Sequence, residues 1–194
     1  MQHCKPKVFF IGFNKTATVA FHQFFLKNNY SSWHNYRRKG KKHNIGKRMD
    51  YNLINHKPIL TGIDDAIAYS DLGGANKNSI VEGCFFYKEL YKEYPSSYYI
   101  LQTRTKENWI NSRIKWNNLP QRTADILNIS TDQVIKKWRE DWDIHHKNVR
   151  KFFEDKDIFL EYNIETDNIM KLINFLSKDF NLNPIFWKKR NVSK

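Results

Sequence analysis

One short polar loop near the start of the chain carries residue types that bind anions: Asn14, Lys15, Thr16, Ala17 and Thr18, with Val19 directly after them. The loop follows an unbroken apolar run at residues 8–11, which is typical of a strand buried on both faces. Apolar side chains at helical spacing come next. A loop between a strand and a helix directs free backbone N–H groups and the positive end of the helix dipole at one point. The sequence therefore predicts a cradle for a phosphate or sulfate group, with the Lys15 ammonium beside it.

The loop is not a Walker A motif. That motif requires G-x-x-x-x-G-K-[ST], whereas here the residue before the lysine is Asn14, two residues after Gly12. The pattern thus predicts anion binding without the usual nucleoside triphosphate signature.

A guanidinium and a hydroxyl lie at fixed spacing after another apolar run. Residues 98–103 predict a core strand, and Arg104 stands at its end. Ser112 follows eight residues later in a predicted helix, on the same broad face as Trp109. The carboxyl ends of parallel strands meet at one edge of a sheet, so we expect Arg104 at the same edge as Lys15. Arg104 and Ser112 together can hold a second phosphate, which the arginine would bind through two hydrogen bonds.

The elements that must position these residues alternate along the chain. Further strands are predicted at residues 30–34, 59–62 and 158–162. Helices are predicted at residues 18–29, 47–56, 79–94, 106–117 and 130–154, and after a Thr166 cap. Ser130 and Gln133 form a capping box, and residues 64–78 are turn-rich. This alternation predicts one α/β domain over residues 1–194, with a mainly parallel central sheet flanked by helices.

The composition limits the classes of partner and compartment. The 194 residues carry 33 lysines and arginines against 20 acidic residues, a net charge of +13. This excess implies an anionic partner: a nucleotide cofactor, an acidic glycan, nucleic acid or a membrane surface. The first residues form no apolar signal region, no run approaches the length of a membrane span, and Cys84 has an apolar setting typical of a reduced thiol. We therefore expect a cytoplasmic protein without a membrane anchor.

These motifs, taken in order, resemble those of the sulfotransferases. The loop is similar to their phosphosulfate-binding loop, P-K-[ST]-G-T-[TS], with Asn14 in place of the proline and Ala17 in place of the glycine. The run from Ile100 to Ser112 fits ILxxRxxxxWxxS and resembles their 3′-phosphate-binding element. Residues 59–95 and 159–176 resemble other parts of the small soluble members, so the resemblance covers most of the chain.

The resemblance implies a three-layer P-loop-like fold and a reaction. A sulfuryl group would pass from 3′-phosphoadenosine 5′-phosphosulfate (PAPS) to a hydroxyl or amine, leaving 3′,5′-bisphosphoadenosine (PAP). Lys15 would be catalytic, residues 14–19 would hold the 5′-phosphate and sulfonate, and Arg104 and Ser112 the 3′-phosphate, joined by Lys189 and Arg190. No metal is expected, because the helix terminus and Lys15 supply the positive field. With alanine at position 17, we expect the loop backbone to keep a negative φ there.

Transfer needs a general base, and the sequence leaves three candidates open: Asp71, His34 and Asp65. Asp71 matches an acidic residue after the second strand of the small sulfotransferases, but it could equally form an Asx turn before two glycines. His34 closes a predicted edge strand. His145 and His146 lie on the long helix, where we interpret them as structural.

Two other functions remain as alternatives. A P-loop-type nucleotide or small-molecule kinase would bind ATP with magnesium, and a basic nucleic-acid-binding protein would show steep salt dependence. Nucleic acid is the less expected partner, because the aromatic residues fit core helices. We expect a small-molecule or glycan acceptor, acidic if the basic residues 37–48 form its surface. The short chain leaves little room for a covering insertion, so the acceptor pocket is expected to be open or completed by a second copy in a homodimer.

Overall fold

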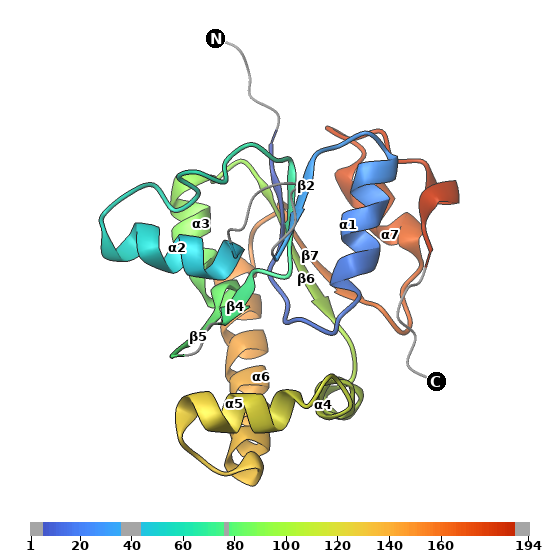
Figure 1. Cartoon of the computed structure of the whole chain (residues 1–194). Coiled ribbons are helices and arrows are strands. Elements are labelled where there is room, and N and C mark those ends of the chain that lie inside the picture. The colour runs from blue at the N-terminus through green and yellow to red at the C-terminus, as the bar shows by residue number, and fades with distance from the viewer. Residues whose placement is uncertain (1–5, 36–43, 76–77, 189–194) are drawn as a thin grey trace.

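The computed structural model describes residues 6–35, 44–75 and 78–188 (Figure 1). Within them, five parallel strands form a central sheet in the order β2-β3-β1-β6-β7. The strands are β1 (Val8–Phe10), β2 (Ser32–His34), β3 (Ala68–Ser70), β6 (Tyr98–Thr103) and β7 (Phe159–Asn163). A separate antiparallel hairpin pairs β4 (Gly73–Ala75) with β5 (Ile80–Glu82). The prediction of an α/β fold with a parallel central sheet is confirmed.

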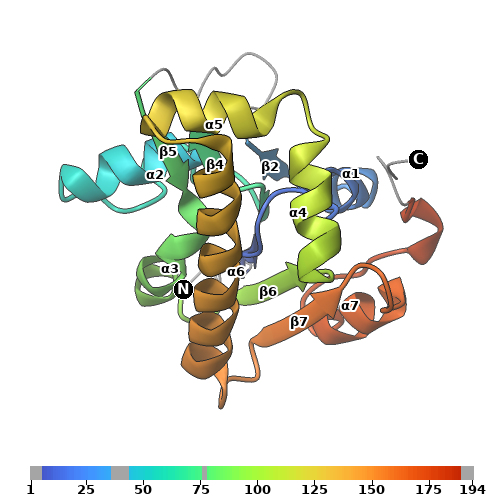
Figure 2. The same cartoon turned by 90° about the horizontal axis from the view of Figure 1, so that it is seen from below.

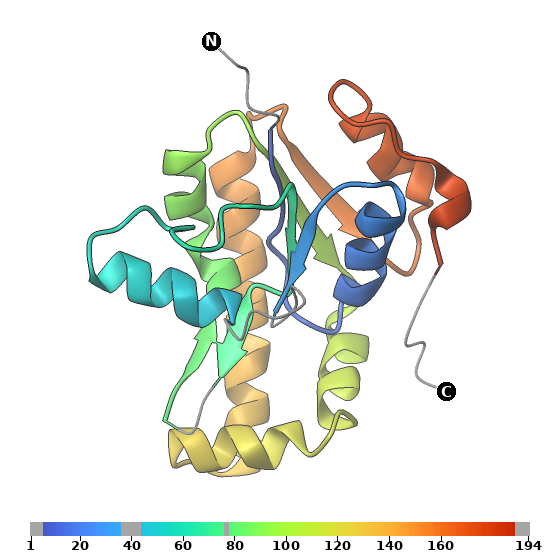
Figure 3. The same ribbon diagram turned by 45° about the horizontal axis from the view of Figure 1, so that its top comes forward.

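Helices cover both faces of the sheet, which gives three layers (Figures 1 and 3). On one face lie α1 (Thr18–Lys27) and α7 (Ile169–Leu176). On the other lie α2 (Ile45–Ile54), α3 (Tyr87–Glu93) and part of α6 (Thr131–Phe153). Phe10 and Ile100 point to the first face, and Phe9 and Tyr99 to the second, all fully buried. A strand covered on both faces must be apolar throughout, which is why these runs do not alternate.

A third apolar cluster lies beyond the carboxyl ends of the strands. There α4 (Lys106–Ile114), α5 (Leu119–Leu127) and the first turns of α6 pack together (Figure 2). Phe13, Trp109, Trp138 and Trp142 fill the space between them. The predicted capping box at Ser130 begins α6. This cluster packs against the loop that follows β1, because Phe13 of that loop is one of its members.

The strand predicted at residues 59–62 is wrong. These residues form turns, and the next strand along the chain, β3, begins at Ala68. The Asn52 side-chain amide donates hydrogen bonds to the carbonyls of Ile59 and Thr61, at 2.9 and 3.0 Å. Because a side chain satisfies these carbonyls, the segment buries Ile59 and Leu60 without joining the sheet.

Two helix boundaries also differ from the prediction. The helix expected at residues 79–94 is α-helical only from Tyr87, because Ile80–Glu82 pairs with Gly73–Ala75 and a 3₁₀ turn, η1 (Gly83–Phe86), follows. The cap of α7 is Asn168, whose Oδ1 accepts from the Met170 amide, and not Thr166. A second 3₁₀ turn, η2 (Pro184–Phe186), follows α7. None of the helices described here combines the length and apolar character that crossing a bilayer requires.

Candidate active site

The loop between β1 and α1 adopts a conformation that the sequence did not predict. Lys15 and Ala17 both have positive φ angles, of 65° and 62°, so the expected negative φ at Ala17 is wrong. For residues other than glycine this left-handed region costs about 1 to 2 kcal/mol each. Gly12, which precedes these residues, is required for a steric reason. A Cβ there would lie 2.0 Å from the Gln102 carbonyl oxygen. Its amide donates to Gln102 Oε1 at 2.8 Å, which ties the start of the loop to β6.

The backbone amides of this loop make few hydrogen bonds within the protein. No acceptor for the backbone N–H groups of residues 14–19 lies among the described residues. Ala17 occupies the N-cap of α1 and provides no side-chain cap. Successive amides whose φ angles alternate in sign form a concave nest that binds anions, and the helix dipole adds to its field. The positive φ angles of Lys15 and Ala17 give the loop the alternation that a nest requires, while anion binding here stays a prediction.

Lys15 lies at this cradle without a paired carboxylate among the described residues. Its ammonium is 4.9 Å from the centre of the Trp116 ring, a cation–π distance. Burial lowers the pKa of Lys15, an effect that Asp71 opposes and Arg104 reinforces. Arg104 Nη1 lies 3.5 Å from the Lys15 carbonyl oxygen, and Asp71 contacts His34, which in turn contacts Thr18 of the same loop. Trp116, which sequence reasoning missed, follows α4 and is 40% exposed.

Arg104 lies at the same edge of the sheet as Lys15, as predicted. Its Nη1 is 3.5 Å from the Lys15 carbonyl oxygen. Its Nε and Nη2 donate to Glu165 Oε1 at 3.1 and 2.8 Å. Glu165 also accepts from the Thr105 amide and from Asn108, so it fixes both the arginine and the first turn of α4. Sequence reasoning missed Glu165, for which the only signal is that it follows the end of β7 at this same edge.

Ser112 lies in the second turn of α4, eight residues after Arg104, and is buried. The two side chains, both in the described part of the chain, share no hydrogen bond. The same helix contacts the loop directly, because Trp109 Nε1 donates to the Asn14 carbonyl at 2.9 Å. Val19 stands in the first turn of α1. Lys189 and Arg190, like the basic residues 37–43, lie outside the described residues.

Two of the three candidate bases meet beside the loop. His34 Nε2 is 3.1 Å from Thr18 Oγ1 and 3.7 Å from Asp71 Oδ2. Asp71 follows β3 directly and also accepts from Asn35 Nδ2 at 3.3 Å. Burial raises the pKa of Asp71 to about 6, against the lowering effect of the Asn35 hydrogen bond. An aspartate with such a pKa is ionised at neutral pH and is a stronger base than an exposed one.

The third candidate and the two helix histidines are placed differently. Asp65 precedes β3, at the opposite edge of the sheet, and accepts from Trp33 Nε1 at 2.7 Å. His145 Nε2 donates to the Ile11 carbonyl at 2.7 Å, and His146 contacts Thr103 Oγ1 at 2.9 Å. Burial lowers the pKa of both histidines to about 4, so they are neutral at pH 7. Their hydrogen bonds agree with the structural interpretation.

Comparison with known families assigns the chain to one of them. A search of curated proteins gives no match for it. The model of the sulfotransferase domain matches residues 7–127. The matched region begins before β1 and contains the loop, Asp71, the exit of β6 and all of α4. Because the match spans more than half of the 194 residues, the chain belongs to the sulfotransferase domain family.

Proposed function

We propose that the protein transfers a sulfuryl group from PAPS to a hydroxyl or amine acceptor and releases PAP. The observation that supports this proposal is that two groups of potential donors to an anion lie at one sheet edge. The unpartnered amides of residues 14–19, with Lys15 beside them, form the first group. Arg104, 3.5 Å from the Lys15 carbonyl, forms the second. A ligand with two separate anionic groups would contact both.

The residues present fit such a donor. The nest and the uncapped end of α1 suit the phosphosulfate, since backbone amides bind an anion without adding a countercharge. Arg104 has its Nη1 directed towards the loop while Glu165 holds its other nitrogens, so its orientation is set in advance. When bound, the donor would supply a sulfuryl group activated by its bond to a phosphate leaving group.

Lys15 would then stabilise the charge that develops on the leaving oxygen. Sulfuryl transfer is similar to phosphoryl transfer, in which positioning and electrostatic stabilisation supply most of the catalysis. The Lys15 ammonium contacts an aromatic ring, and burial lowers its pKa. No carboxylate of the described residues forms an ion pair with it. It can move to the donor without first breaking an ion pair.

Asp71 is the general base that the geometry favours, with His34 as the alternative. Asp71 is buried, electrostatically coupled to Lys15 and 3.7 Å from His34. A base must be deprotonated to accept the acceptor's proton, so kcat/KM should rise with pH through a midpoint of about 6. Asp71→Asn should remove this limb together with the activity, whereas His34→Gln should keep the limb. The opposite result would assign the base to His34.

The proposal is tested by nucleotide binding before turnover. Calorimetry with PAP in the absence of magnesium should give saturable binding, and ATP with magnesium should bind much more weakly. Arg104→Ala should weaken PAP binding by about tenfold or more, because a bidentate charged contact is lost. Labelled PAPS offered with a panel of hydroxyl and amine acceptors then identifies the acceptor class. Magnesium-dependent ATP binding without PAP binding would favour a kinase instead.

A further inference from the structure

One buried arginine of α4 contacts the loop that follows β1. Arg113, in α4, is 3% exposed. Its Nε donates to Asn14 Oδ1 at 2.9 Å, and its Nη2 pairs with Glu82 Oε1 at 2.5 Å. Its guanidinium carbon is 4.7 Å from the ring centres of both Trp109 and Trp138. The side chain thus joins three segments that are far apart in the sequence: the loop, the β5 strand and the third apolar cluster, to which α4 and α6 contribute.

This arrangement is costly for a residue that serves packing alone. An ion pair taken out of water often contributes less stability than apolar side chains of the same volume. Here Arg113 Nη1 is also buried without a hydrogen-bond partner among the described residues. The surrounding cluster of Phe13 and tryptophans would accept an apolar residue at this position. What an apolar residue could not supply is the hydrogen bond to the Asn14 side chain.

Asn14 is held from α4 at two atoms. Its side-chain oxygen accepts from Arg113, and its carbonyl oxygen accepts from Trp109 Nε1 at 2.9 Å. The peptide that this carbonyl belongs to also contains the Lys15 nitrogen. Lys15 has a φ of 65°, in a region that residues other than glycine leave unless neighbours hold them there. The contacts to Asn14 therefore act on the residue whose backbone most needs support.

We propose that Arg113 is a positioning residue of the transfer site, which keeps the Asn14–Lys15 peptide in its anion-binding conformation through the Asn14 side chain. The inference rests on the proposed function. Arg113 does not contact the donor in this scheme. It sets the direction of the loop amides before the anion arrives, so its loss should weaken anion binding even where the fold persists.

The test separates this hydrogen bond from the ion pair. Asn14→Ala removes only the acceptor. Arg113→Met alone would leave the partly buried Glu82 carboxylate without its arginine partner, so it is made together with Glu82→Gln. The third protein combines all three changes. Calorimetry should give PAP binding roughly tenfold weaker for Asn14→Ala than for wild type, as expected for a lost hydrogen bond to a charged group. In the Arg113→Met, Glu82→Gln background, Asn14→Ala should have no further effect.

A second readout does not depend on any nucleotide. The indole Nε1–H of Trp109, which donates to the Asn14 carbonyl, reports on the loop, and its hydrogen exchange in the free protein should be faster in Asn14→Ala and in the Arg113→Met, Glu82→Gln protein. Asn14→Asp, which keeps an acceptor for Arg113, should restore the wild-type exchange rate of this indole. The inference is overturned if the exchange rate of the indole and the PAP affinity in Asn14→Ala stay within twofold of wild type, or if the changes prove additive.

The two readouts distinguish failure of this inference from failure of the proposed function. Wild-type protein that does not bind PAP would contradict the function, while the exchange measurement would still test the hold of Arg113 on the loop. Wild-type binding combined with unchanged indole exchange in the variants would contradict only the role of Arg113.

Discussion

Strand β1 has a lysine near each of its ends, and the two lysines have very different surroundings. Lys7 directly precedes β1 at the amino edge of the sheet, and Lys15 follows it in the loop at the carboxyl edge. The side-chain chemistry is the same in both. The difference between their contacts shows which edge of the sheet serves the fold and which is built to take a ligand.

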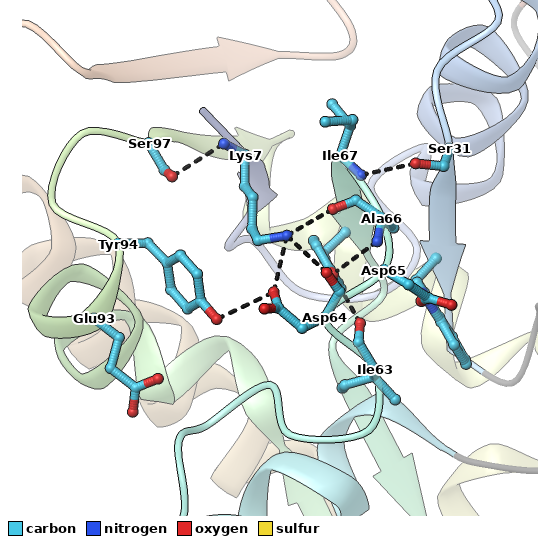
Figure 4. A network of polar contacts seen from close by, with 12 residues as sticks. Lys7, Ser31, Ile63, Asp64, Asp65, Ala66, Ile67, Glu93, Tyr94 and Ser97 are labelled. Carbon is cyan, nitrogen blue, oxygen red and sulfur yellow. Dashed lines mark hydrogen bonds and ion pairs between the residues drawn. The ribbon is translucent and has the colours of Figure 1, made fainter. Parts of the chain in front are cut away.

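At the amino edge the ammonium group is fully satisfied by the protein. Lys7 is 8% exposed, and its Nζ donates to the carbonyls of Asp64 and Ala66 at 3.1 and 2.9 Å (Figure 4). It also pairs with Asp64 Oδ1 at 2.9 Å and lies 5.4 and 5.7 Å from the rings of Tyr69 and Tyr94. These contacts join the start of β1 to the segment before β3, to β3 itself and to the end of α3. Lys7 therefore acts as a structural crosslink.

At the carboxyl edge the ammonium group rests on an exposed tryptophan, and the amides around it lack acceptors among the described residues. Two left-handed residues, Lys15 and Ala17, add local strain. Proteins tolerate such unsatisfied and strained groups mainly where function requires them. The contrast predicts that mutations at the two edges should separate activity from stability.

The largest effect is expected from Lys15→Ala. Removing the group that stabilises the leaving oxygen should lower kcat by about 10²- to 10³-fold. The free energy of unfolding should change by less than about 0.5 kcal/mol, because Lys15 makes no ion pair with a described carboxylate. Turnover of labelled PAPS and urea unfolding measure the two quantities. Lys27→Ala, at the exposed opposite end of α1, is the matched control. Near-normal turnover would remove Lys15 from the mechanism.

The reverse pattern is expected from Lys7→Met, which keeps the apolar stem and removes the ammonium. Two backbone carbonyls would lose their donor, and we expect a loss of about 3 kcal/mol in the free energy of unfolding. The kcat of the folded fraction should be unchanged. Asp64→Asn is the control, because that side chain is 55% exposed and its ion pair should contribute less than about 1 kcal/mol. A lowered kcat with normal stability would break the distinction between the edges.

Asp71→Asn should lose activity and gain stability. Burial raises the pKa of Asp71 to about 6 in the folded protein, so folding disfavours its ionised form. The neutral asparagine avoids this penalty, and the variant should be more stable than wild type by about 3 kcal/mol above pH 6. The advantage should vanish as the pH falls from 6 towards 4, where wild-type Asp71 becomes protonated. Urea unfolding at several pH values measures it. If Asp71 served only its turn, asparagine would preserve activity as well.

The sequence predicted the positions of the main charged groups but not the contacts that orient them. Residues 8–11 and 98–103 are apolar throughout because both faces of their strands are covered, and this identified β1 and β6. Parallel pairing then placed Lys15 and Arg104 at one edge. These inferences needed only local pattern and a general rule of sheet topology.

The parts that failed depend on contacts between distant segments. The positive φ of Ala17 arises in a loop held by Trp109 and Arg113, about a hundred residues away in the chain. The apolar run at residues 59–62 has the pattern of a strand, but the Asn52 side chain donates hydrogen bonds to two of its carbonyls and the run stays outside the sheet. Glu165 had no recognisable motif, since its role depends on β7 ending beside Arg104. A local sequence pattern does not indicate which distant residue will contact a segment in the folded protein.

The smallest effect should come from Glu165→Gln, which tests how the carboxyl edge orients its arginine. The Arg104–Glu165 pair is about one-fifth exposed on each side, so its net contribution is modest. Two effects oppose each other in the variant. The single remaining acceptor cannot serve Arg104, Thr105 and Asn108 together, so the guanidinium loses orientation. Loss of the negative charge, however, raises the local attraction for an anion.

Salt separates these two effects, because screening weakens the long-range attraction and leaves the hydrogen-bond geometry in place. At low ionic strength, calorimetry should find PAP affinity close to that of wild type. At about 0.5 M salt, where charges more than a few ångströms apart are screened, the variant should bind about threefold more weakly than wild type. Tighter binding by the variant at high salt would mean that Glu165 opposes the anion instead of orienting Arg104. The carboxyl edge would then owe its affinity to net charge alone, and its contrast with the fully bonded amino edge would lose its geometric basis.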